Sequence, residues 1–380
     1  MFSLSIQDKK CTIVQETGEN RDEVENREEV LLSVIIPVYN AKEYLPHAVE
    51  DILNQTCPDW ELLLVDDASS DGSLEMVREF EKKDDRIRLI CHEKNKGVSA
   101  ARNTGIANAR GEYLLFMDAD DRYEPTLLEE VNHGIQNAPA DVVLFGFWEE
   151  YIRGEKTVYQ KEFVATEGYY SDPHEIHKLV PDLNRRTMYG YPWNKAYRTG
   201  LVKENHFVFG ADSFGEDILF NIEVFDAVTF LSVIAKPLYH YINRSEKKRL
   251  TGRYIQNYMH CQKKRIGGLL AQQKRWNTLD EATYGYLSEE YFRSFFSMME
   301  REYAHHTSKE EIIEMAEKES ADDLFARMAE HLPQTLGRAK TFMFLPLKEK
   351  DFKCAYDRMR AVSFVRRHMG GLFARLKQDR

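Results

Sequence analysis

The chain has 380 residues, 43% of them apolar, which is enough for two domains or for one large domain with an appendage. Its net charge of −11 argues against a general nucleic-acid-binding protein, and it contains no apolar run of about 18 residues that would span a membrane. The five cysteines are scattered without a C-x-x-C spacing, so reduced thiols are expected rather than a disulfide framework or a zinc site. The first residues lack the basic and apolar regions of a signal peptide, which predicts a cytoplasmic protein.

The beginning of the chain shows where folded structure starts. Residues 1–30 are polar and acidic, which predicts a mobile leader. The β-branched run at 31–40 is typical of a strand buried on both faces. Asn40 and Glu43 then have the spacing of a capping box, which predicts a helix from residue 40, with Pro46 as an irregularity near its start.

Strands and helices then alternate along the chain. The patterns predict strands at 61–67, 86–91, 113–118 and 141–148, and helices from 70 or 71 to 82, at 98–109 and from residue 125. This alternation indicates right-handed βαβ units and a doubly wound α/β domain with a mainly parallel sheet. The pattern becomes irregular and aromatic from about 150 to 245. Beyond 250 it is mostly helical and charged, which predicts an added helical subdomain.

Polar side chains follow three of the predicted strands, namely Tyr39 and Asn40, Asp66 and Asp67, and Asp118 to Asp121. Such groups can simply cap helices or form turns. Because parallel strands end at the same edge of a sheet, however, we expect the three sets to line one crevice. A carboxylate cluster there is stabilised by Mg²⁺ or Mn²⁺, which usually takes phosphate oxygens as its other ligands. The sequence therefore predicts a ligand that carries phosphate.

The class of phosphate ligand is narrowed by motifs that the sequence lacks. It contains no G-x-x-x-x-G-K-[ST] loop, and the segment PVYNAKEY after the first strand has no glycine. The main signatures of P-loop NTPases and of dinucleotide-binding Rossmann domains are therefore absent, which argues against both classes. The remaining candidate ligand is a nucleoside diphosphate that is held through a metal ion.

Four segments carry a resemblance to a known family. SVIIPVYN at 33–40, VDDASSDGS at 65–73, KGVSAARNTGIANARGEYLLFMDADD at 96–121 and GEDILF at 215–220 resemble, in order and spacing, the family 2 glycosyltransferases. These are inverting nucleotide-sugar transferases with a GT-A fold. The resemblance covers residues 31–245 and implies a GT-A catalytic domain there, followed by a helical region at 246–380.

The resemblance implies roles for individual residues. Asp118 and Asp120 correspond to the DxD motif, with Asp120 on the metal ion, Asp118 near the ribose or the metal, and Asp121 supporting the loop. The other residues implied to contact the nucleotide-sugar are Pro37, Val38, Tyr39, Asp66 and Asp67 around the base and ribose, and Arg102 and Asn103 near the nucleotide and donor sugar. A surface position on the helix is the alternative for Arg102.

Inverting transfer also needs a carboxylate that takes the proton of the acceptor hydroxyl. By likeness to the family's ED motif, Asp217 is this base, and Glu216 orients the acceptor or the donor. An alternative is that both acids only favour a helix N-terminus through the helix dipole. The two roles are compatible.

Two further segments bear on the ligands. YPWNKAYRTG at 191–200 resembles the family's W-x-K stretch, so Trp193 is expected to stack on an acceptor sugar and Lys195 to meet a phosphate or carboxylate, with a core position as the alternative for Trp193. In the segment 237–249, Arg244 is the first candidate to face the diphosphate and His240 the second. His174 and His177 have no third metal ligand nearby, which favours a structural or solvent-facing pair.

The C-terminal stretch is a separate electrostatic region. Residues 338–380 carry a net charge of +8 in a chain whose total is −11. From residue 356 onward, basic and apolar side chains are mixed, as in segments that lie on an anionic membrane surface. Packing on its own domain is the alternative, and Gly370 and Gly371 argue against one continuous helix in either case.

The sequence as a whole predicts a cytoplasmic, metal-dependent, inverting glycosyltransferase. Its basic C-terminal stretch is compatible with a peripheral position on the inner face of the membrane. The expected donor is a UDP-sugar, and the expected acceptor is a hydroxyl of a glycan, a lipid-linked sugar or a surface polysaccharide. The alternatives are a sugar nucleotidyltransferase and a catalytically silent scaffold that binds nucleotide-sugar. The sequence does not determine which sugar is transferred or whether the chain forms a homo-oligomer.

Overall fold

The computed structural model describes residues 32–368 apart from 155, 212–213 and 245–253. The chain forms two units, one comprising Met1–Ala211 with Glu216–Lys247 and the other Asp212–Gly215 with Lys248–Arg380. Within the described residues, no helix is both long and apolar enough to cross a bilayer. Cys57, Cys261 and Cys354 are reduced and form no disulfide, whereas Cys91 is disulfide-bonded, so the prediction of reduced thiols is wrong at Cys91.

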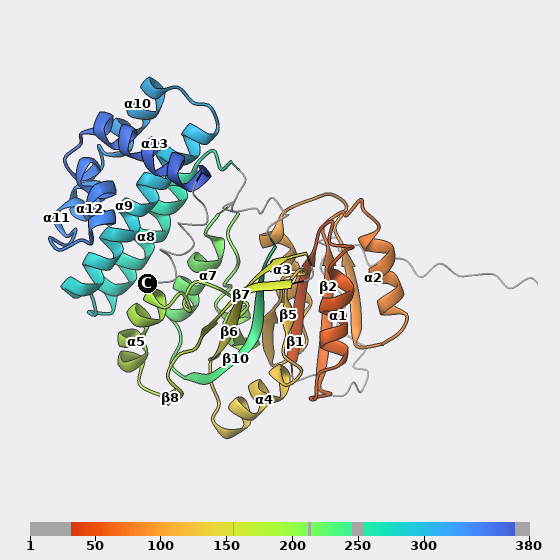
Figure 1. The fold of residues 1–380 in the computed structure, drawn as a ribbon. Helices are drawn as coiled ribbons and strands as arrows, with labels where there is room; N and C mark the ends of the chain where they lie inside the picture. The colour runs from red at the N-terminus through yellow and green to blue at the C-terminus, as the bar shows by residue number, and fades with distance from the viewer. Residues whose placement is uncertain (1–31, 155, 212–213, 245–253, 369–380) are drawn as a thin grey trace, which may run out of the picture. The chain divides into compact units, whose positions relative to one another are not determined.

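The first unit is built on a mixed sheet with strand order β3-β2-β1-β4-β9-β6-β10-β5 (Figure 1). Its first half is parallel and consists of β1 (Leu32–Val38), β2 (Trp60–Asp66), β3 (Ile87–Cys91) and β4 (Tyr113–Phe116). The connecting helices are α1 (Leu45–Leu53), α2 (Ser73–Glu81) and α3 (Val98–Asn108). Every residue of β2 is buried, as the apolar runs predict for strands covered on both faces.

The second half of the sheet mixes strand directions. β9 (Lys195–Arg198) runs antiparallel between β4 and β6 (Val142–Arg153), and β10 (Leu231–Arg244) lies parallel to β6. Three further strands pair antiparallel with β6 or β10. β5 (Arg122–Tyr123) and β8 (Gly168–Tyr170) pair with β10, and β7 (Lys156–Phe163) pairs with β6. The remaining helices are α4 (Leu127–Asn137), α5 (Pro173–Arg185), α6 (Thr199–Glu204) and α7 (Glu216–Phe225).

The first helix begins later than the capping-box pattern predicts. α1 starts at Leu45, with Pro46 in its first turn and no side-chain cap. Asn40 instead has a left-handed φ of 50°, and its side-chain oxygen accepts a hydrogen bond from the Ser70 backbone N–H at 2.8 Å. Because proline lacks an N–H and fits the first turn of a helix, Pro46 fixes the start there. The predicted helix start at residue 40 is therefore wrong.

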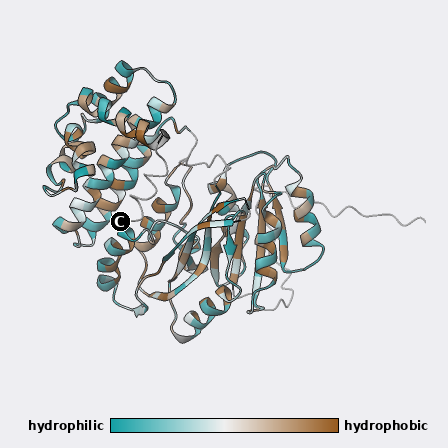
Figure 2. Cartoon of the chain, in the orientation of Figure 1, coloured by the Kyte–Doolittle hydropathy of each residue, from teal (hydrophilic) through white to brown (hydrophobic). Residues whose placement is uncertain are grey.

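The second unit is helical, as predicted. Its helices are α8 (Tyr258–Arg275), α9 (Glu281–Ala304), α10 (Lys309–Glu319), α11 (Asp323–Glu330), α12 (Arg338–Lys348) and α13 (Phe352–His368). Tyr291, Phe292 and Phe295 of α9 are fully buried and pack against Phe325 of α11. Figure 2 shows polar and apolar residues on each of these helices, as expected when one face of a helix lies in a core.

Candidate functional site

The three predicted strand ends meet at one edge of the sheet. β1 lies between β2 and β4 and is parallel to both, and Val38 at the end of β1 is paired with Asp66 at the end of β2. The segment after β4 stays beside β1, because the Met117 N–H donates to the Ile35 carbonyl at 3.0 Å. Asp118 follows directly. The acidic groups are therefore neighbours because of the parallel topology.

Arg102 connects this edge to helix α7. It lies on α3, is 3% exposed, and donates to Asp118 Oδ1 at 3.0 Å through Nη2 and to Asp217 Oδ1 at 2.5 Å through Nη1. Glu216 Oε1 lies 3.8 Å from the same Nη1. Burial opposes the charge of Arg102, but the three carboxylates raise its pKa above the ordinary value. A buried cation thus joins two acidic motifs that are far apart in the sequence.

Glu216 and Asp217 open helix α7. Burial, followed by the neighbouring charge of Asp217, raises the pKa of Glu216 to about 7. Burial also raises the pKa of Asp217, although Arg102 opposes this shift. With one guanidinium shared among three carboxylates, the cluster can accept or release a proton near neutral pH, as general acid–base catalysis requires.

Replacing Glu216 with glutamine should stabilise the protein more at pH 8 than at pH 5. Folding raises the pKa of this carboxyl from 4.5 to about 7, so its contribution to stability is full below 4.5 and is lost as the pH rises through about 7. Glutamine removes the buried charge, and we expect a gain of about 1–3 kcal/mol at pH 8. Thermal unfolding at both pH values measures this. An equal change in Tm at pH 5 and pH 8 would contradict the raised pKa.

The loop after β4 contains three aspartates: Asp121 is buried, whereas Asp118 and Asp120 are partly exposed. Asp121 is buried and accepts hydrogen bonds from the Tyr239 hydroxyl at 2.7 Å and the Ile242 backbone N–H at 2.8 Å. Burial raises its pKa, and its position agrees with the predicted role of supporting the loop. The side chains of Asp118 and Asp120 are 34% and 45% exposed. They are the carboxylates that can meet a ligand.

These two carboxylates suit a cation that completes its coordination with phosphate and water. Mg²⁺ is commonly held by one or two carboxylates together with substrate phosphates. The described residues contain no group of three or more His, Cys, Asp or Glu side chains arranged to hold a metal ion, so they form no closed protein cage. His174 and His177 of α5 accordingly belong to no such group.

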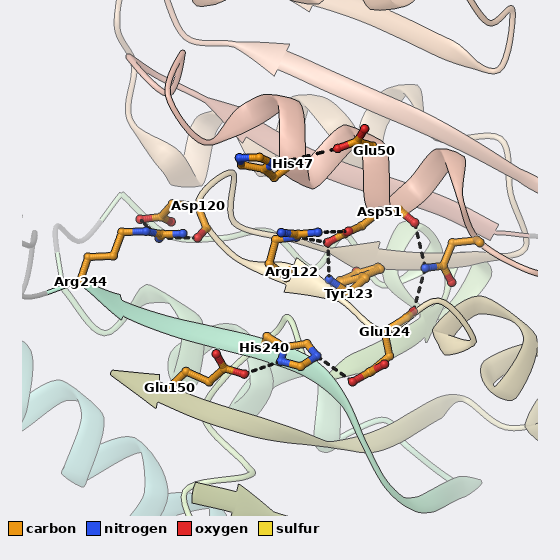
Figure 3. A network of polar contacts seen from close by, with 11 residues as sticks. His47, Glu50, Asp51, Asp120, Arg122, Tyr123, Glu124, Glu150, His240 and Arg244 are labelled. Atoms are coloured by element: carbon orange, nitrogen blue, oxygen red, sulfur yellow. Dashed lines mark hydrogen bonds and ion pairs between the residues drawn. The ribbon is translucent and has the colours of Figure 1, made fainter. Parts of the chain in front are cut away.

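Arg244 lies against the same loop. Its Nη1 donates to the Asp120 backbone carbonyl at 2.6 Å and lies 3.9 Å from Asp120 Oδ2 (Figure 3). Its guanidinium carbon is 4.2 Å from the centre of the Tyr44 ring. The residue predicted to face the diphosphate is thus placed beside Asp120. His240 is placed differently: its Nδ1 contacts Glu150 at 2.7 Å and its Nε2 contacts Glu124 at 2.8 Å. Both ring nitrogens are therefore engaged within the protein.

Asp66 and Asp67 have different surroundings. The Asp67 carboxylate accepts hydrogen bonds from the Lys96 and Gly97 backbone N–H groups, both at 2.8 Å, and contacts His92 Nδ1 at 2.6 Å. It therefore anchors the loop before α3 rather than facing a ligand. Asp66 Oδ2 accepts from the Ser69 N–H at 3.2 Å, but its buried Oδ1 has no hydrogen-bond partner in the described part of the chain. Asp66 keeps an acceptor for a ligand.

The residues at the start of the crevice differ in exposure. Tyr39 is 52% exposed, whereas Val38 is fully buried and Pro37 is half-buried. Asn103 lies on α3, and its amide forms two hydrogen bonds with Phe209, from Nδ2 to the carbonyl at 2.9 Å and from the Phe209 N–H to Oδ1 at 2.8 Å. Asn103 therefore links α3 to the backbone of Phe209, because both Nδ2 and Oδ1 of its side chain form hydrogen bonds there.

Trp193 and Lys195 lie in the core rather than at a surface. Trp193 is 2% exposed and stacks on Tyr239 and Tyr191, with ring centroids 4.4 and 4.5 Å apart. Lys195 is fully buried, and burial lowers its pKa well below the ordinary value. Its ammonium donates to four oxygens, the carbonyls of Met188, Tyr189 and Tyr191 and the side chain of Asn194. These contacts correct the expectation that the two residues meet an acceptor directly.

Tyr239 is a site residue that the sequence patterns did not single out. Its hydroxyl donates to Asp121 Oδ2 and accepts a hydrogen bond from the Asp118 backbone N–H at 3.2 Å. It thereby holds both ends of the Asp118–Asp121 turn. Its place in the aromatic stretch at 237–242 was the available signal, but the partner lies 118 residues away in the sequence.

The fold and the site together define a nucleotide-binding type of α/β domain with an acidic, arginine-bridged edge. The model described as Glycosyl transferase family 2 matches residues 33–204, so this segment of the chain is similar to that family. The predicted family and fold class are thereby confirmed.

Individual relatives agree with this assignment. The chain is 31% identical over 212 residues to the uncharacterized glycosyltransferase EpsJ of Bacillus subtilis, covering 56% of this chain and 60% of that protein's length. It is 28% identical over 226 residues to the poly(ribitol-phosphate) β-N-acetylglucosaminyltransferase TarS of Staphylococcus aureus, covering 59% of this chain and 37% of TarS. The chain thus spans 60% of the length of EpsJ and 37% of the length of TarS, which is less than two thirds in both cases.

A solved structure shares the fold over more of the chain. The crystal structure of S. aureus TarS 1–349 in complex with UDP matches with a TM-score of 0.60 at 21% identity, covering 88% of this chain and 91% of that one. TarS 1–349 in complex with UDP-GlcNAc matches with a TM-score of 0.59. These matches show that the chain has the GT-A fold.

Proposed function

We propose that this protein transfers a sugar, with inversion, from a UDP-sugar to a hydroxyl of a glycan, a lipid-linked sugar or a surface polymer. The observation that carries the proposal is the Arg102 bridge, which brings Asp217 beside Asp118 of the DxD motif. A hydroxyl that enters between them meets a base on one side and a phosphate-binding edge on the other. The solved structures of TarS with UDP and UDP-GlcNAc support the choice of donor.

The donor is held at the ends of β1, β2 and β4. Asp66 Oδ1 is a buried acceptor without a partner in the described residues, and it suits an N–H group of the nucleobase. The exposed ring of Tyr39 gives the base an apolar surface. Asp118 and Asp120 would hold Mg²⁺ or Mn²⁺, which when bound supplies positive charge that neutralises the leaving diphosphate. Arg244 places a second cation at the same loop.

Asp217 acts as the general base. Its carboxylate takes the proton of the acceptor hydroxyl while that oxygen bonds to the anomeric carbon, and the bond from this carbon to the diphosphate oxygen breaks on the opposite face. The bonding electrons leave with the nucleoside diphosphate. Arg102 keeps Asp217 ionised before the reaction, because its guanidinium contacts the carboxylate directly. Glu216, with a pKa of about 7, orients the acceptor or the donor at the same edge.

A panel of nucleotide-sugars tests the proposal. The protein is incubated with UDP-, GDP- and CDP-sugars in the presence of Mn²⁺ or Mg²⁺, and hydrolysis and thermal stabilisation are measured. We expect UDP-sugars to raise Tm in a metal-dependent manner, because a ligand that binds the folded state stabilises it by mass action. We also expect slow release of UDP with water as acceptor.

Two other results would contradict the proposal. Release of pyrophosphate from a nucleoside triphosphate and a sugar phosphate would indicate a nucleotidyltransferase. Metal-dependent binding of UDP-sugars without turnover, in the presence of any glycan acceptor tested, would indicate a silent scaffold. The match to the glycosyltransferase family favours transfer over both alternatives.

We further propose peripheral attachment to an anionic membrane through the C-terminal helices. Phe342 and Leu345 of α12 are 43% and 39% exposed, and Phe364 of α13 is 61% exposed, in a stretch that carries excess positive charge. Met359 of α13, in contrast, is fully buried. Helix α13 thus packs one face on its own unit, and Phe342 and Leu345 of α12 are the exposed apolar side chains on which the proposal rests. The predicted tail beyond residue 368 lies outside the described residues.

A further inference from the structure

One face of the sheet carries an unusual mixture of aromatic and polar side chains. β6 and β10 run side by side (Figure 1), and their register pairs Tyr239 with Phe147, Tyr241 with Glu149 and Asn243 with Tyr151. Residues two positions apart in a strand point to the same side, so these six side chains share one face. The face continues onto β7, where Tyr159 pairs with Tyr151.

Within the described residues, Trp193 closes one end of this face and the other end is only half-buried. Trp193 packs over Tyr239 and makes an edge contact with Phe147 at 4.8 Å, which buries both. Trp193 also stacks on Tyr241 at 5.5 Å, and Tyr191 stacks on Trp193 and on Tyr241, but these two tyrosines are only half-buried. Two stacked tyrosine rings, with an interplanar angle of 29°, therefore border the partly exposed end of the face.

Polar groups with unused hydrogen-bonding capacity lie next to the tyrosines. Glu149 is half-buried and accepts a hydrogen bond from the Tyr151 hydroxyl at 3.0 Å. Asn243 is only 1% exposed, and its Nδ2 lies 3.4 Å from the same Glu149 oxygen. Its Oδ1 is buried and has no hydrogen-bond partner in the part of the chain described. A buried unpaired acceptor is costly, and a ligand that donates to it would remove that cost.

The open end adjoins both halves of the proposed reaction centre. The strand that carries Tyr241 also supplies the Tyr239 hydroxyl and the Ile242 N–H that hold Asp121. On the other side, the Asn221 amide donates to the carbonyls of Gly190 and Asp217, which ties the segment before Tyr191 to the first turn of α7. The backbone segments that carry Tyr241 and Tyr191 are thus connected by hydrogen bonds to the Asp118–Asp121 loop and to the first turn of α7, respectively.

We propose that Tyr191, Tyr241, Glu149 and Asn243 form a subsite for a sugar ring of the acceptor. A pyranose has an apolar face of C–H groups that packs on an aromatic ring, and hydroxyls at its edge that bond to carboxylates and amides. Aromatic walls with a few placed polar groups are the usual composition of such sites. The inference depends on the proposed function for the role of the ring as acceptor. It replaces Trp193 as the stacking residue, because Trp193 lies beneath the tyrosines.

Saturation-transfer NMR with methyl glycosides of glucose, galactose and N-acetylglucosamine tests the subsite. We expect at least one glycoside to show saturation of its ring C–H protons with the wild-type protein, in the presence of saturating UDP and the diamagnetic ion Mg²⁺. Tyr241→Leu and Glu149→Gln should each weaken binding about tenfold or more, whereas Tyr241→Phe should retain it because the ring remains. Tyr169→Leu is the matched control, since Tyr169 is an exposed tyrosine on β8.

Each outcome decides the inference. If the wild type binds no glycoside but still binds UDP with metal, the subsite is refuted and the proposed function stands. If binding is unchanged in Tyr241→Leu and Glu149→Gln, the glycoside binds elsewhere. If UDP abolishes glycoside binding, the ring occupies the donor position instead. If Tyr241→Leu does not fold, Glu149→Gln alone decides. Failure of UDP itself to bind would instead contradict the proposed function.

Discussion

Replacing Asp217 with asparagine is expected to lower the rate of sugar transfer by about 10²- to 10⁴-fold while UDP binding remains. Asparagine has nearly the same shape as aspartate but cannot take the proton of the acceptor hydroxyl. Arg102 would still contact Asp118 and lie near Glu216, so the buried cation keeps carboxylate partners. The rate constant kcat is measured by UDP release with acceptor, and the affinity for UDP by calorimetry with Mn²⁺.

A matched control lies on the same helix. Glu223 of α7 is exposed, so Glu223→Gln replaces a carboxylate on the same helix without changing the carboxylates that contact Arg102. The variant should transfer sugar at the wild-type rate. Turnover by Asp217→Asn within a few-fold of the wild type would remove Asp217 from the mechanism. Loss of both UDP binding and activity would instead mean that Asp217 acts mainly through Arg102.

Replacing Asp120 with alanine is expected to abolish metal-dependent UDP binding without lowering the stability of the free protein. The side chain is 45% exposed, so its removal leaves no buried cavity. In the wild type, UDP and Mn²⁺ at about 100 times the dissociation constant should add about 2.7 kcal/mol of stability. In Asp120→Ala this gain should disappear, as measured by thermal unfolding with and without UDP and Mn²⁺.

Two further aspartate substitutions serve as controls for Asp120→Ala. Asp85→Ala changes an exposed aspartate before β3 and should keep the full stabilisation by UDP and Mn²⁺. Asp121→Ala removes a buried carboxylate that binds Tyr239 and Ile242, and it should lower Tm even without ligand. An Asp120→Ala protein that is stabilised by UDP and Mn²⁺ as strongly as the wild type would exclude Asp120 from the metal site.

Features that depend on neighbouring residues in the chain were predictable from sequence. The strands of the parallel half consist of continuous apolar residues, and each predicted strand from residue 31 to 148 overlaps a strand of the structure. The helix start at Leu45 departed from prediction because Pro46 outweighed the capping pattern. The sequence pattern does not predict individual strands between residues 150 and 245. One reason is that β10 contains Pro237, and its pairing with β6 shifts register on both sides of this residue.

The roles of individual side chains depended on residues distant in sequence. Lys195 looks like a phosphate ligand in isolation, yet its ammonium is enclosed by backbone carbonyls of 188–191. Asp67 is the same residue type as its neighbour Asp66, but its carboxylate accepts hydrogen bonds from two N–H groups of the loop at 96–97. No local pattern distinguishes these cases. A charged residue becomes structural when the fold surrounds it with partners, and this is decided by packing.

The sequence by itself determined the family, the α/β class and the two acidic motifs, because short contiguous segments encode a strand, the turn that follows it and the residues in that turn. The tertiary structure alone decided that Asp118 and Asp217 share Arg102, which lies 16 residues from one and 115 from the other. It also decided that Trp193 is covered by tyrosines. Proximity of that kind arises from strand order and helix packing, which bring together side chains that no local spacing relates.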